Sequence, residues 1–199
     1  ASRVGGLDIG FVPQAGSLSA EAMAKGGVDV LFNLGADEIE IGAGPFVVYI
    51  GTHGDRGAHR ADVILPGAAY TEKSGIFLNT EGRVQVANRA TFPPGEARED
   101  WAILRALSDV LGKKLPFDSL VQLRAKLYAA HPHFAAIDEI APGEIADLSA
   151  LAKKGGTMAN SGFASPIKDF YLTNPIARAS AVMAECSALA RNNFKAAAE

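Results

Sequence analysis

Residues 28–65 read VDVLFNLGADEIEIGAGPFVVYIGTHGDRGAHRADVIL, and this stretch decides the predicted fold. It contains short apolar runs, rich in β-branched residues, at 28–34, 45–50 and 61–65. Runs of this kind, bounded by glycine and proline, are typical of buried strands. Their close spacing predicts an open, mostly parallel α/β sheet, and the first connection is too short for a full crossover helix.

Two segments next to this stretch have clear local signals. Residues 17–26 predict a short helix that Ser17 or Ser19 can cap and that the glycine pair after it ends. Residues 76–78 and 84–86 alternate apolar and polar side chains around Gly82, which predicts a β-hairpin.

Three further helices are expected after Pro93-Pro94-Gly95. The first covers 97–111, with acidic residues in its first turn and Gly112 at its end. The second covers 119–130, where Ser119 and Gln122 form a capping box and Leu120, Leu123 and Leu127 form an apolar stripe. The third is long and alanine-rich, running from Pro175 to about residue 194.

The predicted fold class is therefore α/β, with a short, mostly parallel open sheet flanked by helices, a β-hairpin excursion and an α-helical C-terminal tail. We divide the chain into an α/β domain (1–130), an irregular linker (131–165) and a helical tail (166–199). The tail carries an apolar stripe of Ile176, Met183, Cys186 and Leu189. We expect this stripe either to pack on the chain's own sheet or to contact another subunit.

The overall composition excludes several classes of function. Of the 199 residues, 48% are apolar and 21% are charged, as in globular proteins, and the net charge of −3 argues against a nucleic-acid partner. The apolar runs are too short to insert in a membrane, and no signal peptide is visible. The lone Cys186 reads as a core residue. A start at Ala1 rather than methionine predicts a piece of a longer chain.

Three motifs carry a resemblance to known proteins. They are ADVILPGAAYTEK at 61–73, NTEGR at 79–83 and PPGEAREDW at 93–101. Their order resembles the molybdopterin oxidoreductase superfamily. Their full wording, together with IKDFY at 167–171 and RAS at 178–180, resembles the C-terminal part of the large iron–sulfur subunit of NADH:quinone oxidoreductase, respiratory complex I.

The resemblance implies a structural segment of an enzyme that moves electrons from NADH to quinone in a respiratory chain. The implied partners are other subunits of the peripheral arm. The implied location is the cytoplasmic side of the bacterial inner membrane, or the matrix side in mitochondria. In that family, cysteines and a histidine of the N-terminal part bind the iron–sulfur clusters, so no cofactor and no catalytic residue are expected in the present chain.

An alternative is a pterin-nucleotide-binding module of a molybdopterin oxidoreductase. The resemblance implies a vestigial pterin-facing loop, whose candidate residues are His53, Asp55, Asp62, Glu72, Lys73 and Asn79. The Glu72-Lys73 and Glu81-x-Arg83 pairs also fit ion pairs and hydrogen bonds that hold an irregular loop.

Chemistry by the chain alone remains a further possibility. His53, Asp55 and His59 have side chains suited to a metal, although a turn after a strand explains them equally well. Gly51–Gly57 lacks the glycine patterns of nucleotide loops, and no nucleophile elbow of a small hydrolase is present. Trp101 is expected to be a core anchor, and His131 and His133 to be residues at a helix end or on the surface.

Overall fold

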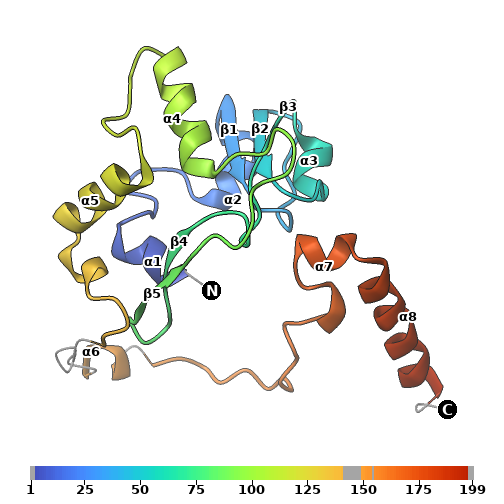
Figure 1. Ribbon diagram of the computed structural model, residues 1–199. Helices are drawn as coiled ribbons and strands as arrows, with labels where there is room; N and C mark the ends of the chain where they lie inside the picture. Colours follow the sequence, from blue (N-terminus) through green and yellow to red (C-terminus); the bar gives the residue numbers. More distant parts are fainter. Residues whose placement is uncertain (1–2, 141–148, 154, 197–199) are drawn as a thin grey trace.

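The structure is a computed structural model, and it describes residues 3–140, 149–153 and 155–196 (Figure 1). Its elements in chain order are α1 (Arg3–Asp8), α2 (Ala20–Ala22), the π-helical turn η1 (Met23–Gly27), β1 (Val30–Leu34), β2 (Phe46–Gly51), α3 (Arg56–Arg60), β3 (Val63–Pro66), β4 (Gly75–Leu78), β5 (Val84–Ala87), α4 (Asp100–Val110), α5 (Leu120–Ala130), the 3₁₀ turn η2 (Pro132–Ala135), α6 (Ser149–Ala152), the 3₁₀ turn η3 (Phe170–Leu172), α7 (Pro175–Ala179) and α8 (Ala181–Ala196).

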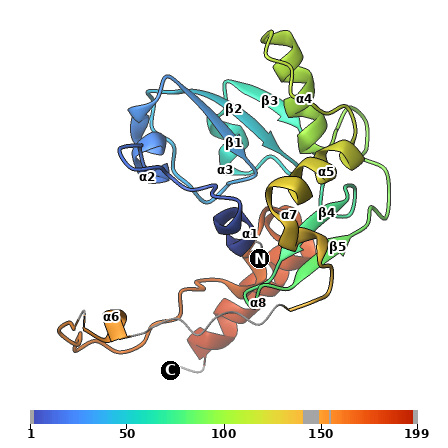
Figure 2. The same ribbon diagram turned by 90° about the vertical axis from the view of Figure 1, so that its left-hand side faces the viewer.

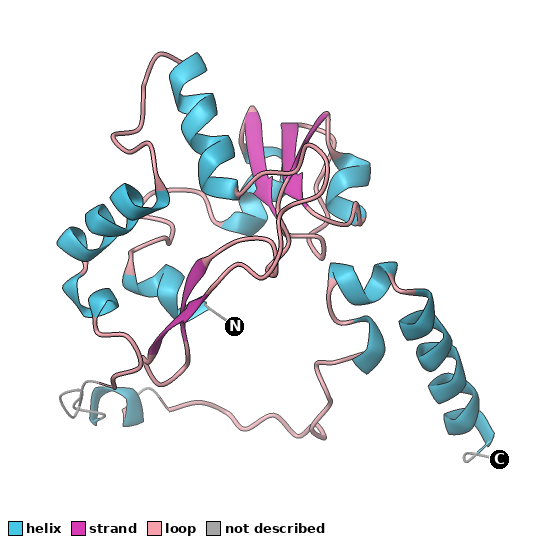
Figure 3. Cartoon of the chain, in the orientation of Figure 1, coloured by secondary structure: helices cyan, strands magenta, loops and turns pink. Residues whose placement is uncertain are grey.

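The parallel sheet confirms the α/β prediction. Its order is β1-β2-β3, with Val30 opposite Phe46 and Val48 opposite Val63. The connection from β1 to β2 contains no helix, as its length predicted, whereas α3 connects β2 to β3. β4 and β5 form the predicted hairpin as a separate antiparallel pair, and Gly82 lies in its turn with a positive φ of 85° (Figure 3).

Only the central strand of the parallel sheet is buried, so the prediction of three buried strands is wrong for β1 and β3. Val30, Phe32 and Leu34 alternate onto one face of β1 and are 51%, 41% and 49% exposed. An apolar sequence pattern indicates which side chains favour burial, but it does not indicate whether another helix or strand covers them. In the described part of the chain, the segments around this face do not bury its outer side chains.

A second core lies between the hairpin and α5. Leu78 and Val84 pack against Phe134 of η2, with Leu127 and Tyr128 of α5 around them. The segment after η2 stays on the hairpin, because the backbone N–H of Asp138 donates to the Val84 carbonyl at 2.7 Å. The division at residue 130 stays a proposal, and these contacts favour extending the first part to about residue 138.

The caps of α4 and α5 follow the sequence. Ser119 caps α5 by accepting a hydrogen bond from the backbone N–H of Gln122 at 3.2 Å. The Gln122 side chain in turn accepts from the backbone N–H of Asp118 at 2.6 Å, which completes a variant of the predicted capping box. α4 spans Asp100–Val110, and Gly112 follows it with a positive φ of 70°.

The tail contains two helices, so the prediction of one continuous helix is wrong. Asn174 caps α7 by accepting a hydrogen bond from the backbone N–H of Ala177 at 2.9 Å, and Pro175 is the first helical residue as predicted. Ser180 then adopts extended backbone angles (φ −87°, ψ 121°), and its hydroxyl accepts from the backbone N–H of Met183 at 3.4 Å. A serine at this position favours the start of a new helix over continuation of the old one.

The second tail helix, α8, extends away from the parallel sheet (Figure 1). It packs on η3, where Ser187 donates to Asp169 at 2.5 Å and Arg191 donates to the same carboxylate at 2.8 Å. Val182 and Leu189 stay exposed on it. In the view turned by 90°, the extended segment after α6 leads back toward α7 and α8 (Figure 2).

Candidate functional site at the carboxyl edge of the parallel sheet

The carboxyl ends of β1, β2 and β3 lie at one edge of the sheet. Open α/β sheets bind ligands at this edge, because the loops after the strands meet there. The loop after β1 supplies Asp37 and Glu38, and the loop after β2 supplies His53 and Asp55. This edge of the sheet is therefore the candidate functional site.

The carboxylate of Asp37 is the buried centre of the edge, with the residue only 1% exposed. It accepts hydrogen bonds from the Tyr49 hydroxyl and from the backbone N–H of Gly57, each at 3.2 Å. Burial, with the neighbouring Asp37 charge, raises the pKa of Tyr49 to about 12. The phenol therefore stays protonated and keeps donating to the carboxylate at neutral pH.

Gly57 makes this close packing possible. A side-chain Cβ at that position would lie 2.7 Å from the Tyr49 ring and 2.9 Å from an Asp37 oxygen. Both neighbours are buried, so neither has free space to move into. The glycine thus lets α3 approach the sheet and places its backbone N–H on the carboxylate.

Arg178 of α7 closes the edge from the far end of the chain. Its guanidinium donates to Asp55 through Nε, to Glu38 through Nη2 at 2.9 Å and to the Leu172 carbonyl through Nη1 at 3.1 Å. The Arg178 and Asp55 side chains are only 24% and 22% exposed. One cation of the tail therefore neutralises acidic side chains from two strand-end loops.

This ion pair shifts the pKa values of both partners. Desolvation alone would raise the pKa of Asp55, but the hydrogen bond from Arg178, the backbone N–H of Arg56 and the charges of both arginines together outweigh it and hold that pKa below the usual range. Desolvation likewise opposes the charge on Arg178, and its bonds to Asp55 and Glu38 raise its pKa overall. Both side chains are charged at neutral pH.

A shallow cavity of about 520 Å³ separates the edge from the tail. Thr52 and Tyr70 line it from the sheet side, and residues of α7 and the start of α8 line the other side. The tail thus lies over the edge at which a ligand would bind in an open α/β sheet.

The alternative of a metal site at His53, Asp55 and His59 has no matching arrangement of these three side chains in the structure. His53 is exposed, with its Nδ1 2.7 Å from the Thr52 hydroxyl, and Asp55 is engaged by Arg178. His59 lies exposed in the last turn of α3. Within residues 3–140, 149–153 and 155–196, no three histidine, cysteine or acidic side chains converge as a metal site would require.

The side chains of Asp62 and Glu72, two of the proposed pterin-facing residues, accept hydrogen bonds from backbone N–H groups of other residues in this chain. Asp62 accepts from the backbone N–H of Val47 at 2.7 Å and from Arg60 at 3.4 Å, and the Val47 bond is the main reason that its pKa is lowered. Glu72 accepts from the backbone N–H of Ala69 at 2.9 Å. The hydrogen bond of Glu72 agrees with the expectation that this residue holds an irregular loop.

Lys73 and Asn79 lie on the hairpin excursion. Lys73 forms an ion pair with Asp100 at 2.5 Å, and Asn79 accepts from the backbone N–H groups of Glu81 and Arg83 at 2.9 Å each. Asn79 therefore shapes the hairpin turn. Of the six candidate residues, His53 and Asp55 lie on the loop that follows β2.

Four residues of this edge were missed by the sequence reasoning: Asp37, Glu38, Tyr49 and Arg178. Asp37 had a usable signal, because it follows the first predicted strand directly. Tyr49 looked like one more apolar strand residue. Arg178 is 123 residues from Asp55 along the chain, and no local sequence pattern predicts such a pairing.

Comparisons with known proteins agree with the sequence resemblance. Residues 1–110 match the family model of molybdopterin oxidoreductases, and residues 136–186 match that of the C-terminal part of the G subunit of NADH-ubiquinone oxidoreductase. The 78 kDa mitochondrial subunit of NADH-ubiquinone oxidoreductase from Neurospora crassa is 44% identical over 98% of this chain. The 75 kDa subunit from Reclinomonas americana is 44% identical over 97%, and the 78 kDa subunit from Candida albicans is 47% identical over 94%.

These relatives are much longer than the chain. It spans 27% of the Neurospora subunit, 28% of the Reclinomonas subunit and 26% of the Candida subunit. In the described residues, no helix is both long enough and apolar enough to cross a bilayer.

Proposed function

We propose that the chain, which belongs to the molybdopterin oxidoreductase family, is the C-terminal structural segment of a large NADH-ubiquinone oxidoreductase subunit, because residues 136–186 match the C-terminal model of the G subunit and the relatives are subunits of that enzyme. In this role it supports electron transfer from NADH to quinone by the parent enzyme and performs no chemistry itself. The observation that carries the proposal is Arg178, which holds the tail on Glu38 and Asp55 at the edge where a ligand would bind.

The polar groups at this edge have partners from their own chain. Asp37 accepts from Tyr49 and Gly57, and Asp55 is bound by Arg178. Groups engaged in this way stabilise the fold, whereas a catalytic group must remain available to a substrate. The arrangement supports a structural role over the alternative of a pterin-nucleotide module.

We also propose that the tail contacts other subunits of the peripheral arm, on the cytoplasmic or matrix side of the membrane. The supporting feature is α8, which leaves the sheet and exposes Val182 and Leu189. Apolar side chains on a projecting helix are typical of protein interfaces.

The test uses Arg178→Gln and Asp55→Asn in the full-length parent subunit, with His53→Ala as the matched control at the same edge. Assembled enzyme is quantified on native gels, and NADH oxidation is measured with quinone and with ferricyanide. A structural role predicts less assembled enzyme, with unchanged turnover per assembled complex, and no effect of the control. Normal assembly with lower turnover would refute the proposal, as would normal values for both.

The absence of a cofactor in this segment is a separate proposal. The purified chain is expected to carry no stoichiometric iron, zinc or molybdenum and no pterin nucleotide. Elemental analysis showing about one metal per chain that is lost in His53→Ala would contradict the first part. A pterin nucleotide released on acid extraction, at about one per chain, would favour the pterin-nucleotide module instead.

A further inference from the structure

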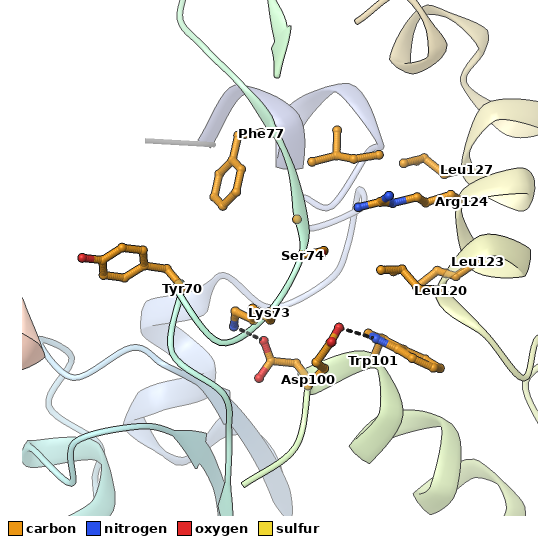
Figure 4. Close-up of a pocket in the computed structure, with 13 residues that line it drawn as sticks. Tyr70, Lys73, Ser74, Phe77, Asp100, Trp101, Leu120, Leu123, Arg124 and Leu127 are labelled. Carbon is orange, nitrogen blue, oxygen red and sulfur yellow. Dashed lines mark hydrogen bonds and ion pairs between the residues drawn. The ribbon is translucent and has the colours of Figure 1, made fainter. Parts of the chain in front are cut away.

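A second cavity, of about 390 Å³, lies between the hairpin and α5, and Tyr70 lines both this cavity and the one at the carboxyl edge (Figure 4). Its wall is mostly apolar. The predicted stripe of α5 faces it, and β4 and the start of α4 close the other sides. The apolar residues that line it are Ile76, Phe77, Trp101, Leu120, Leu123 and Leu127. This size and lining are typical of small-molecule sites, which combine apolar walls with a few polar groups.

Arg124 of α5 is the unusual polar group of this cavity. Its Nη2 atom is buried and has no hydrogen-bond partner. Among the residues that the structure describes, it is the one buried side-chain nitrogen or oxygen without a partner. In Figure 4 the guanidinium extends from α5 toward the strand that carries Phe77. A buried donor left unsatisfied is costly, and a charged donor more so.

The other charged groups of the cavity are already paired. Lys73 is bound to Asp100 at 2.5 Å. Glu99 accepts from the Trp101 indole at 2.8 Å and lies 3.7 Å from Arg89. Figure 4 shows Lys73, Asp100 and Trp101 together at the end of the cavity opposite Arg124. Among the described residues that line the cavity, one positive charge is therefore left without a counter-charge, and it belongs to Arg124.

From this we infer that the cavity binds a small amphiphilic anion, with its apolar body against the leucine stripe of α5 and its anionic head on Arg124. A carboxylate suits the head, because a guanidinium donates two parallel hydrogen bonds to it. An apolar body suits the walls, because burying it there removes apolar surface from water on both sides. The inference is independent of the structural role proposed above.

The experiment uses octanoate as the probe and 1-octanol as its neutral counterpart. Trp101 is the only tryptophan of the chain and lines the cavity, so its fluorescence reports occupancy directly. Octanoate is expected to shift this fluorescence saturably in the 199-residue chain, and octanol to bind at least about tenfold more weakly. Calorimetry gives the stoichiometry, which is expected to be one.

The variants are Arg124→Met and, as the matched control, Lys126→Met on the exposed side of the same helix. Arg124→Met is expected to weaken octanoate binding about tenfold or more and to leave octanol binding unchanged. Because it replaces an unpaired cation by an apolar side chain of similar length, its melting temperature is expected to equal or exceed that of the wild type. Lys126→Met is expected to bind octanoate like the wild type.

Three results would overturn the inference. Octanoate affinity could be equal in Arg124→Met and the wild type, or equal to that of octanol in the wild type, and either would reduce the cavity to an apolar depression. A wild-type chain that does not respond to octanoate at 10 mM, a concentration on the order of the Kd of a weak small ligand, would leave a protein segment as the occupant.

Discussion

The tail should dock on the sheet mainly through Arg178, and Arg178→Gln tests this. The bond to Asp55 is charged at both ends and about one-fifth exposed, so its loss is expected to cost about 1.5–3 kcal/mol. The Glu38 side chain is 62% exposed, and its pairing adds no more than about 1 kcal/mol. A total of about 1.5–4 kcal/mol lowers the docking equilibrium by about 12- to 700-fold.

Hydrogen exchange on the 199-residue chain measures this loss where it occurs. α7 has five residues and cannot hold its hydrogen bonds alone, so undocking exposes the amides of Arg178 and Ser180. Protection across 172–180 is expected to fall by the same factor, while protection in β2 stays constant. Arg191→Gln removes a solvent-exposed tail cation of the same type and should leave α7 protected.

Two outcomes would refute the reasoning. Unchanged protection of α7 in Arg178→Gln would mean that other contacts dock the tail, and an equal loss in β2 would mean that the variant destabilises the whole fold. A double-mutant cycle adds an independent check. If Asp55 acts on docking only through Arg178, Asp55→Asn combined with Arg178→Gln costs little more than Arg178→Gln alone.

Further predictions concern the two cores and the pH dependence. Phe134→Ala is expected to destabilise the chain by about 3–5 kcal/mol in urea unfolding, because Phe134 is 4% exposed; Phe170→Ala, at a 76% exposed site, should change stability by less than about 0.5 kcal/mol. Gly57→Ala is expected to cost about 1–3 kcal/mol through overlap with buried side chains, and a melting curve like that of the wild type would contradict this. Because the pKa of Asp55 is lowered on folding, its stabilising contribution is present above about pH 4 and is lost as the pH falls through the lowered value. The NMR shift of the Arg178 Nε–H group should therefore stay constant from about pH 8 to pH 4 and move only below that range; a change centred near neutral pH would show that another group controls docking.

Local features of the fold followed from local chemistry. The caps at Ser19, Ser119 and Asn174 were predictable because a polar side chain at a helix start accepts a hydrogen bond from a backbone N–H two or three residues later. The hairpin was predictable because alternation and Gly82 act over a few residues. The break at Ser180 was missed because the apolar period continues across it, and periodicity does not report backbone angles.

Long-range features did not follow from the sequence. The exposure of β1 depends on which segments cover the sheet, and the apolar pattern of Val30, Phe32 and Leu34 is the same with or without a cover. The pairing of Arg178 with Asp55 depends on how the chain returns to the sheet after the linker. A single sequence contains no signal for such a return, because neither residue is unusual in its own surroundings.

In the proposed structural role, the carboxyl edge of the parallel sheet holds the C-terminal tail of the chain. An edge that binds ligands needs polar groups that are placed by the fold and still free to bind. Here Asp37 is used inside the sheet, to hold Tyr49 and the backbone of Gly57, and Asp55 is used outside it, to hold the tail. Because its charge is matched by Arg178, a ligand anion or cation at Asp55 would first have to displace the tail. A ligand at Asp55 would therefore compete with the contact that joins the C-terminal tail to the parallel sheet.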